Sequence, residues 1–377
     1  MSAPATTIFT TMTALAQETG AINLGQGFPD EDGPAEVVEA AVAALRNGTQ
    51  NQYAPLAGVP PLVAAVRDHQ RRRYGLEVED VQVTFGATEA LSCALLGLLQ
   101  AGDELVVLEP VYDSYEPIAR MAGATMRRVA LHPPAWRLDP GELRAAVTPR
   151  TRLVLLNSPH NPTGRVLDRG ELEAVAALCR EHDLIAVTDE VYEHLVLEGE
   201  HVPLASLPGM AERTLTISSV GKTYSFTGWK IGWASGPAEL VAAVRGVKQF
   251  LSFSGGTPLQ HATAAALNAG DALPAALAAA LRAKHDRLID GLAAAGFGVL
   301  PSQGTYFVCA DAAPLGHPDA QELALRLPHE AGVVAIPVTA FVADPLGETR
   351  SLLRFAFCKR EAVLDQAVER LTRWAGR

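Results

Sequence analysis

Two lysines in one stretch of hydroxyl residues and glycines are the side chains best placed to do chemistry. Lys222 follows the apolar, β-favouring residues 214–217, and Lys230 lies a short distance further along the chain. A neighbouring positive charge and partial desolvation favour the neutral amine of a lysine, which is its nucleophilic form. The stretch therefore suits imine chemistry between Lys222 and a phosphorylated aldehyde.

The same lysine also belongs to a sequence that resembles the end of a nucleotide-binding P-loop, Gly221-Lys222-Thr223. That motif requires a glycine five residues before the second glycine, and this chain has Thr216 at that position. Nucleotide binding thus fits the residues less well than imine chemistry, and a nucleotide-binding shift assay would separate the two.

Length, charge and cysteine content limit the classes of protein to consider. The 377 residues are enough for a large domain and a smaller one. A net charge of −11 argues against binding to nucleic acid or to an anionic membrane. The 4 cysteines lack CxxC spacing and are expected to be reduced core residues. With no apolar run of membrane-spanning length and no signal-peptide pattern in residues 1–17, we expect a cytoplasmic protein.

The elements that must position the lysines alternate between strands and helices. Runs of Val, Ile and Leu at 104–108, 152–156 and 184–188 predict buried strands, and helical patterns at 140–147 and 169–182 lie between them. This alternation predicts an α/β fold whose large domain has a mostly parallel sheet sandwiched by helices. Polar or aromatic residues follow each strand, at the sheet edge where open α/β sheets bind ligands.

A short strand at 81–85 leads through Gly86, Ala87 and Thr88 into an apolar helix expected over 89–99. A strand, a glycine turn and a helix start together offer free backbone N–H groups and a positive dipole end to an anion. Such turns are also common in α/β folds without any ligand, so the turn alone leaves both interpretations open.

The last part of the chain has a different pattern. An alanine-rich helix is expected at 272–292, followed by strands at 296–301, 304–309 and 352–357 and helices at 321–327 and 361–374. We therefore predict a large domain over 46–280 and a smaller α+β domain built from 1–45 and 281–377.

Single residues support weaker conclusions. Arg354 stands in an expected strand of Leu, Phe and Ala, where a charge is costly unless an anion meets it. Asp189 alone would suit a helix cap or a turn, and Tyr112 alone would suit a core position. The histidines show no metal-ligand spacing, so we predict no metal site.

Taken together, the motifs resemble those of a known family. The segments Asn161-Pro-Thr-Gly164, Asp189-Glu-Val-Tyr192 and Ser219-Val-Gly-Lys222 with Lys230 are similar to the signature set of the class I/II aminotransferases, pyridoxal-phosphate enzymes of fold type I. The resemblance covers nearly the whole chain. Within the family, residues 26–30 and 158–163 resemble the kynurenine and methionine aminotransferases. Residues 27–34, 192–196 and 228–234 resemble the actinobacterial N-succinyldiaminopimelate aminotransferases still more closely.

The resemblance implies a role for each motif residue around pyridoxal phosphate. Lys222 would bind the cofactor aldehyde and, once the substrate amine has released it, move a proton between the substrate Cα and the cofactor. Asp189 would pair with the pyridine nitrogen and keep the ring an electron sink. Tyr192 and Asn161 would hydrogen-bond the phenolic oxygen, and Tyr112 would stack on the ring.

The family also implies binding sites for the phosphate and the substrate. The phosphate would meet the strand-to-helix turn and two side chains of the lysine stretch: Gly86, Ala87, Thr88, Ser219 and Lys230. Many relatives have arginine in place of Lys230, so the planar fork of a guanidinium is lost here while the charge is kept. Tyr53 would reach the phosphate of a partner subunit, which implies a homodimer with shared active sites.

For the substrate, Arg354 would bind the α-carboxylate through a bidentate fork, helped by the Gly27 backbone and by Asn161. Phe28, Tyr115 and a loop at Thr257 would line the pocket. The implied reaction is transamination between an amino acid, with glutamate as the expected donor, and a 2-oxo acid. The acceptor would be the N-succinyl-2-amino-6-oxopimelate of lysine biosynthesis. A broad methionine, glutamine or aromatic aminotransferase with β-lyase side activity is the alternative, and a non-catalytic cofactor-binding regulator is a third.

Overall fold

A seven-stranded sheet forms the centre of the protein, of which the computed structural model describes residues 7–376. The strand order is β2-β8-β7-β6-β5-β3-β4. Its strands are β2 (Asp80–Phe85), β3 (Glu104–Glu109), β4 (Thr125–Ala130), β5 (Thr151–Asn157), β6 (Ile185–Asp189), β7 (Thr214–Ser219) and β8 (Ile231–Gly236). Strand β8 runs antiparallel to both its neighbours, and the other pairs are parallel. The predicted α/β class and the mostly parallel sheet are confirmed.

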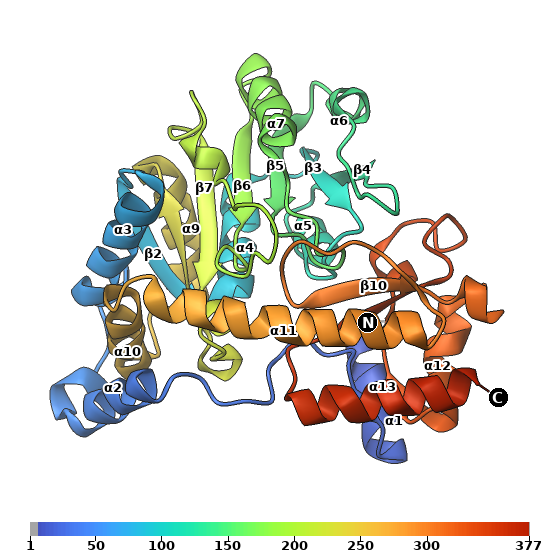
Figure 1. Cartoon of the computed structure of the whole chain (residues 1–377). Coiled ribbons are helices and arrows are strands. Elements are labelled where there is room, and N and C mark those ends of the chain that lie inside the picture. Colours follow the sequence, from blue (N-terminus) through green and yellow to red (C-terminus); the bar gives the residue numbers. More distant parts are fainter. Residues whose placement is uncertain (1–6, 377) are drawn as a thin grey trace, which may run out of the picture.

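Helices cover both faces of this sheet because its strands are apolar on both sides (Figure 1). Side chains alternate along a strand, so in β3 Leu105 and Val107 face one core while Val106 and Leu108 face another. The first core is completed by α4 (Gly86–Leu98), α5 (Tyr115–Met121) and α9 (Ala238–Leu251). The second is completed by α6 (Pro140–Ala146) and α7 (Arg169–Glu181).

A third group of helices packs at the β2 edge of the sheet. It consists of α2 (Ala35–Arg46), α3 (Pro60–Tyr74) and α10 (Thr257–Asn268). Val83 and Trp233, from β2 and β8, contribute to the same apolar core. From there α11 (Ala272–Ala294) runs across the molecule toward the second sheet (Figure 1).

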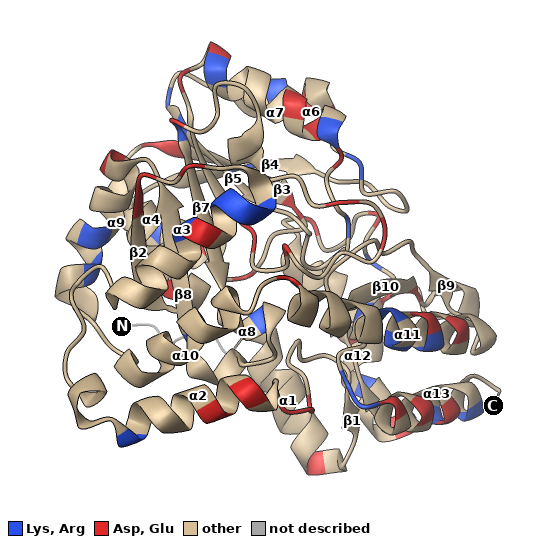
Figure 2. Cartoon of the chain, turned by 60° about the vertical axis from the view of Figure 1, so that its left-hand side comes forward, with Lys and Arg blue, Asp and Glu red and all other residues tan. Residues whose placement is uncertain are grey.

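The second sheet has four strands in the order β12-β13-β10-β9, and β1 pairs separately with β11. The bounds are β1 (Ile22–Asn23), β9 (Gly298–Val299), β10 (Phe307–Asp311), β11 (Val333–Val334), β12 (Ile336–Pro337) and β13 (Leu352–Ala356). The helices of this part are α1 (Ile8–Thr19), α12 (Ala320–Glu330) and α13 (Glu361–Ala375). Helix α13 lies along α11 (Figure 2). Arg287 of α11 joins the two helices through ion pairs with Glu361 and Asp365 of α13.

Three expected boundaries were wrong. Helix α4 begins at Gly86 instead of residue 89, because Gly86 has a φ of +72° that lets the strand turn directly into the helix. Thr257 opens α10 instead of lying in a loop, and Pro258 suits the first turn of that helix. The strand expected at 304–309 begins at Phe307. The domain division within α11 stays a prediction, and residues 1–6 and 377 of the expected smaller domain lie outside the described residues.

Within residues 7–376, no single helix has the length and apolar character needed to cross a membrane. Only the pair formed by α10 and α11, which are bent by 85° relative to each other, has the length and composition of a membrane-spanning segment.

Candidate active site

One cavity of about 250 Å³ lies where the carboxyl ends of the parallel strands meet the second sheet. Nearly all of the predicted site residues line it: Gly27, Gly86, Ala87, Thr88, Tyr112, Asn161, Asp189, Tyr192, Ser219, Lys222, Lys230 and Arg354. They come from segments that are distant in sequence, so the fold itself assembles the cavity. Phe28 and Tyr53 do not line it.

Lys222 lies on the short helix α8 (Val220–Thr223), immediately after β7. Its Nζ donates a hydrogen bond to the Gly27 carbonyl over 3.3 Å and lies 5.8 Å from the centre of the Tyr192 ring. Burial lowers the pKa of Lys222 to about 8, and the charges of Arg354 and Lys230 act in the same direction. A larger share of the amine is therefore neutral and nucleophilic near neutral pH than for an exposed lysine.

Asp189 ends β6 and is held by two neighbouring side chains. Tyr115 Oη donates to Asp189 Oδ2 over 2.7 Å, and Asn157 Nδ2 donates to the Asp189 carbonyl over 2.9 Å. Burial raises the pKa of Asp189 to about 6, although the Tyr115 hydrogen bond opposes the rise. A buried carboxylate that faces a cavity suits a cationic ligand group, because such a group would restore the charged form.

Another part of the cavity wall suits an anion. The amino end of α4 has no side-chain cap, so its first N–H groups are free to bind a ligand. A Cβ placed on Gly86 would lie 3.4 Å from Lys230 Nζ, so the ammonium sits beside this helix start. A Cβ on Gly232 would lie 2.6 Å from the Gly86 carbonyl carbon, so a glycine is needed there for β8 to approach α4.

Arg354 is 1% exposed and belongs to β13, one of the two inner strands of the second sheet, from which it reaches the cavity wall. Its Nη1 donates to Asn161 Oδ1 over 2.8 Å and its Nη2 to the Gly25 carbonyl over 2.7 Å. The guanidinium carbon lies 3.9 Å from the centre of the Phe307 ring. Its Nε is buried without a hydrogen-bond partner in residues 7–376. A buried guanidinium with an unpaired donor suits a carboxylate ligand, which would supply the missing acceptor and countercharge.

Sequence reasoning missed part of the wall. Phe9 and Gln26 line the cavity, and Gln26 Nε2 donates to the Phe9 carbonyl and to Thr13 Oγ1 of α1. The N-terminal helix therefore closes one side of the site. No motif marks α1, so only its position in the fold reveals this role. Tyr115 was expected to line the pocket but lies behind it, where it holds Asp189.

Phe28 and Tyr53 lie outside this cavity. Phe28 is 47% exposed, and its ring lies 4.3 Å from Lys359 Nζ. Tyr53 is 83% exposed, with its ring against that of Phe253. Their expected roles toward the substrate and a partner subunit stay predictions.

The chain belongs to the class I and II aminotransferases, whose family model matches residues 19–371. It is an enzyme of that kind, which excludes the P-loop and non-catalytic alternatives. A probable N-succinyldiaminopimelate aminotransferase of Mycobacterium tuberculosis is 51% identical over 381 residues, covering 98% of this chain and 96% of the relative. A methionine aminotransferase of Escherichia coli is 42% identical over 370 residues, covering 97% and 95%.

Solved structures agree with this assignment. The structure of N-succinyldiaminopimelate aminotransferase from Mycobacterium tuberculosis superimposes with a TM-score of 0.96 at 52% sequence identity, covering 98% of this chain and 97% of that one. The resemblance inferred from the sequence motifs is confirmed.

Proposed function

We propose that the protein is a pyridoxal-phosphate-dependent aminotransferase that acts on N-succinyl-LL-diaminopimelate and its 2-amino-6-oxo counterpart, with glutamate as the usual amino donor. The observation that carries the cofactor assignment is the single cavity that joins Lys222, Asp189, the uncapped start of α4 and Arg354. The observation that supports the substrate is the 51% identity to the mycobacterial relative over 98% of the chain.

The residues present fit the cofactor. The free N–H groups of α4, with Ser219 and Lys230 beside them, would hold the phosphate, and Asp189 would hold the proton on the pyridine nitrogen. Tyr192 and Asn161 would hydrogen-bond the phenolic oxygen, and Tyr112 would cover the ring. When bound, pyridoxal phosphate supplies an aldehyde for attachment to an amine and a ring that withdraws electrons from the substrate Cα.

The chain's own groups would then bind and orient the substrate. Arg354 would fix the α-carboxylate, and its contact with Asn161 Oδ1 would align that carboxylate with the ring position. Once the substrate amine has taken its place on the cofactor, the Lys222 amine would be neutral and free. It would take the proton from the substrate Cα and deliver it to the carbon that had been the cofactor aldehyde. Phe9 and Phe307, both in the wall, would exclude water from this proton transfer.

A homodimer is part of the proposal. The exposed Tyr53 and the neighbouring Phe253 would lie at a subunit interface, with Tyr53 reaching the partner's phosphate and Thr257 close by. The large domain at 46–280 would carry the cofactor, and 1–45 with 281–377 would close over it. Light scattering combined with size-exclusion chromatography tests the dimer, and a monomer at micromolar concentration would contradict it.

A broad methionine or aromatic aminotransferase is the second candidate, because the methionine aminotransferase of Escherichia coli is 42% identical over nearly the whole chain. The two are separated by kcat/KM for N-succinyl-LL-diaminopimelate, methionine and kynurenine with a common 2-oxo acid. We expect the succinylated donor to be preferred at least about tenfold, or about 1.4 kcal/mol in transition-state binding. Preference for methionine or kynurenine would transfer the assignment to the second candidate.

A further inference from the structure

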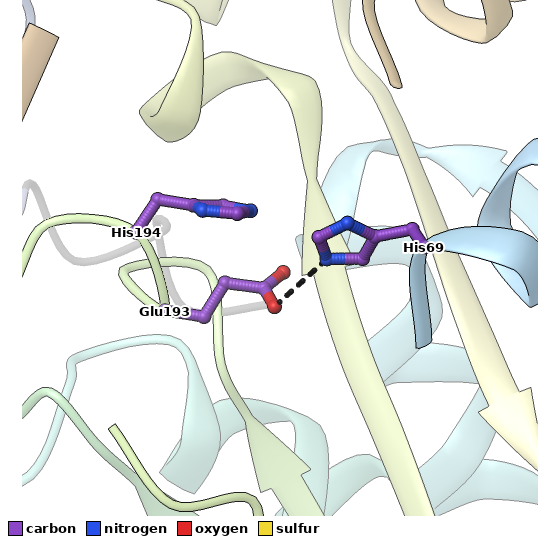
Figure 3. A group of neighbouring side chains, drawn as sticks. All are labelled: His69, Glu193 and His194. Atoms are coloured by element: carbon purple, nitrogen blue, oxygen red, sulfur yellow. Dashed lines mark hydrogen bonds and ion pairs between the residues drawn. The ribbon is translucent and has the colours of Figure 1, made fainter. Parts of the chain in front are cut away.

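Three buried side chains outside the cofactor cavity form a compact cluster of metal-binding types: His69, Glu193 and His194 (Figure 3). They are 2%, 1% and 6% exposed, respectively. His69 comes from α3, and the other two come from the turn that follows β6. One ligand atom from each residue lies within 4.8 Å of the other two, so small shifts of the side chains would bring all three to one ion.

Glu193 carries a buried carboxylate, and within residues 7–376 no lysine or arginine forms an ion pair with it. Its one ion-pair neighbour there is His69, whose Nε2 lies 3.3 Å from Oε2. Tyr74 Oη donates to the same oxygen over 2.7 Å, and Ser218 Oγ donates to Oε1 over 2.6 Å. Neutral hydroxyls do not cancel a buried charge, so a cation bound at this site would stabilise the Glu193 carboxylate.

His194 provides a second, independent sign of a missing ligand. Its Nδ1 is buried and has no hydrogen-bond partner among the described residues, and buried polar atoms of native proteins are nearly always paired. Its side chain also lines an open cleft of about 760 Å³, together with Tyr74 and His201. The cleft is also lined by Arg72, Arg73 and Arg282, and His194 is the one cluster residue that it reaches.

We propose that His69, Glu193 and His194 bind one divalent transition-metal ion of the Zn²⁺ type. Two imidazoles and a carboxylate are a ligand set that suits zinc, which takes a water as the fourth ligand when the protein supplies three. The Tyr74 and Ser218 hydroxyls orient the carboxylate, as hydrogen-bonded neighbours of metal ligands commonly do. None of the three residues lines the cofactor cavity, so the site is independent of the proposed cofactor.

The position of the cluster gives the ion a stabilising role. Glu193 and His194 continue the turn that carries Asp189 and Tyr192, while His69 belongs to α3, which packs at the far edge of the sheet. A bound ion would join these two parts of the chain directly. Because the ligand atoms are brought together only by folding, ion binding should stabilise the folded protein.

The test is zinc binding to the full-length enzyme after removal of metal with a chelator, measured by calorimetry and by thermal unfolding. Wild type should bind one Zn²⁺ per chain and unfold at a higher temperature with zinc. His194→Ala should weaken binding at least about tenfold. Tyr74→Phe removes the hydrogen bond to Glu193, and with it the one that Tyr74 Oη accepts from Arg73 Nε, and should weaken binding about 10- to 100-fold. The control Glu200→Gln changes an exposed carboxylate of the same cleft and should bind as wild type does.

Each alternative result would overturn the proposal. Failure of the wild type to bind zinc stoichiometrically would mean that the cluster holds no metal ion. Equal binding by wild type, His194→Ala and Tyr74→Phe would mean that the ion is adventitious or sits on the cofactor. Loss of binding in Glu200→Gln alone would place the ion elsewhere in the cleft. Should His194→Ala fail to fold, the milder Tyr74→Phe variant decides on its own.

Discussion

The Arg354→Lys substitution tests how the proposed site recognises the α-carboxylate of its substrates. Two of the guanidinium nitrogens are already fixed by Asn161 and the Gly25 carbonyl, and Nε is without a partner. The fork is therefore held in one orientation before a substrate arrives. A lysine ammonium keeps the positive charge but cannot satisfy both contacts and also grip a carboxylate with two parallel hydrogen bonds.

The size of the effect follows from the loss of one charge-assisted hydrogen bond, which is worth about 1.5–3 kcal/mol. At about 1.4 kcal/mol per factor of ten, kcat/KM should fall roughly 10- to 150-fold. Most of the loss should be in KM, because the carboxylate is bound in both the ground state and the transition state. The fall in kcat/KM should be similar for the amino donor and for the 2-oxo acid, since both substrates carry this carboxylate.

The assay is steady-state kinetics with each substrate varied in turn, and with the cofactor absorbance as a check that the site is intact. Arg373→Lys, at an exposed position of α13 that is 61% exposed in its side chain, is the matched control and should behave as wild type. A kcat/KM for Arg354→Lys within about threefold of wild type would refute the reasoning. A fall in kcat/KM for only one of the two substrates would also refute it.

Three further predictions address the cofactor end of the cavity. Gly232→Ala should weaken cofactor binding, measured as a dissociation constant by fluorescence quenching, by about 1–3 kcal/mol, since the new Cβ would meet the start of α4 at 2.6 Å. The control Gly246→Ala, whose Cβ would meet nothing within 4 Å, should leave this dissociation constant unchanged. The rate of cofactor attachment, followed by stopped-flow absorbance, should rise with pH and level off above about pH 8, the pKa of Lys222; a continued rise to pH 10 would show an unshifted lysine. Tyr115→Phe should lower the free energy of unfolding of the cofactor-free protein, measured in urea, by about 1.5–3 kcal/mol at pH 8 but by much less at pH 5. The reason is that Asp189, with its pKa raised to about 6, is charged only at the higher pH. An equal loss of stability at both pH values would contradict this account.

The sign of the Asp189 effect follows from its raised pKa. A carboxyl group whose pKa is higher in the folded protein than in the unfolded chain favours folding when it is protonated, and this contribution is lost as the pH rises through about 6. The Tyr115 hydrogen bond limits that loss because it stabilises the charged form.

The parallel strands and the residues that follow them could be predicted because β3, β5 and β6 contain apolar runs and β7 contains β-favouring residues. Lys222 and Asp189 were placed at strand ends for that reason, and β7 and β6 do carry them to one cavity. The role of Asp189 came only from the family resemblance. Strand β4 was not predicted, because it contains Arg127 and Arg128 at the edge of the sheet. Charges on an edge strand prevent pairing with other chains, and they also remove the apolar signal that identifies a strand.

Contacts between distant segments could not be predicted in the same way. Phe9 enters the cavity because α1 packs against the second sheet, and no local pattern encodes that packing. His69 and Glu193 are 124 residues apart, so the absence of metal-ligand spacing in the sequence gave no information about the cluster they form. Such sites depend on the topology of the whole chain, which single-sequence patterns do not specify.

The central claim is that Lys222 binds pyridoxal phosphate covalently, and borohydride reduction followed by peptide mass spectrometry tests it most directly. The purified enzyme is reduced with the cofactor bound, digested, and searched for the phosphopyridoxyl mass on each lysine peptide. The account predicts the added mass on Lys222, its loss in Lys222→Ala, and no label on Lys230. A label on Lys230, or no label on any lysine of the cofactor-saturated enzyme, would contradict it.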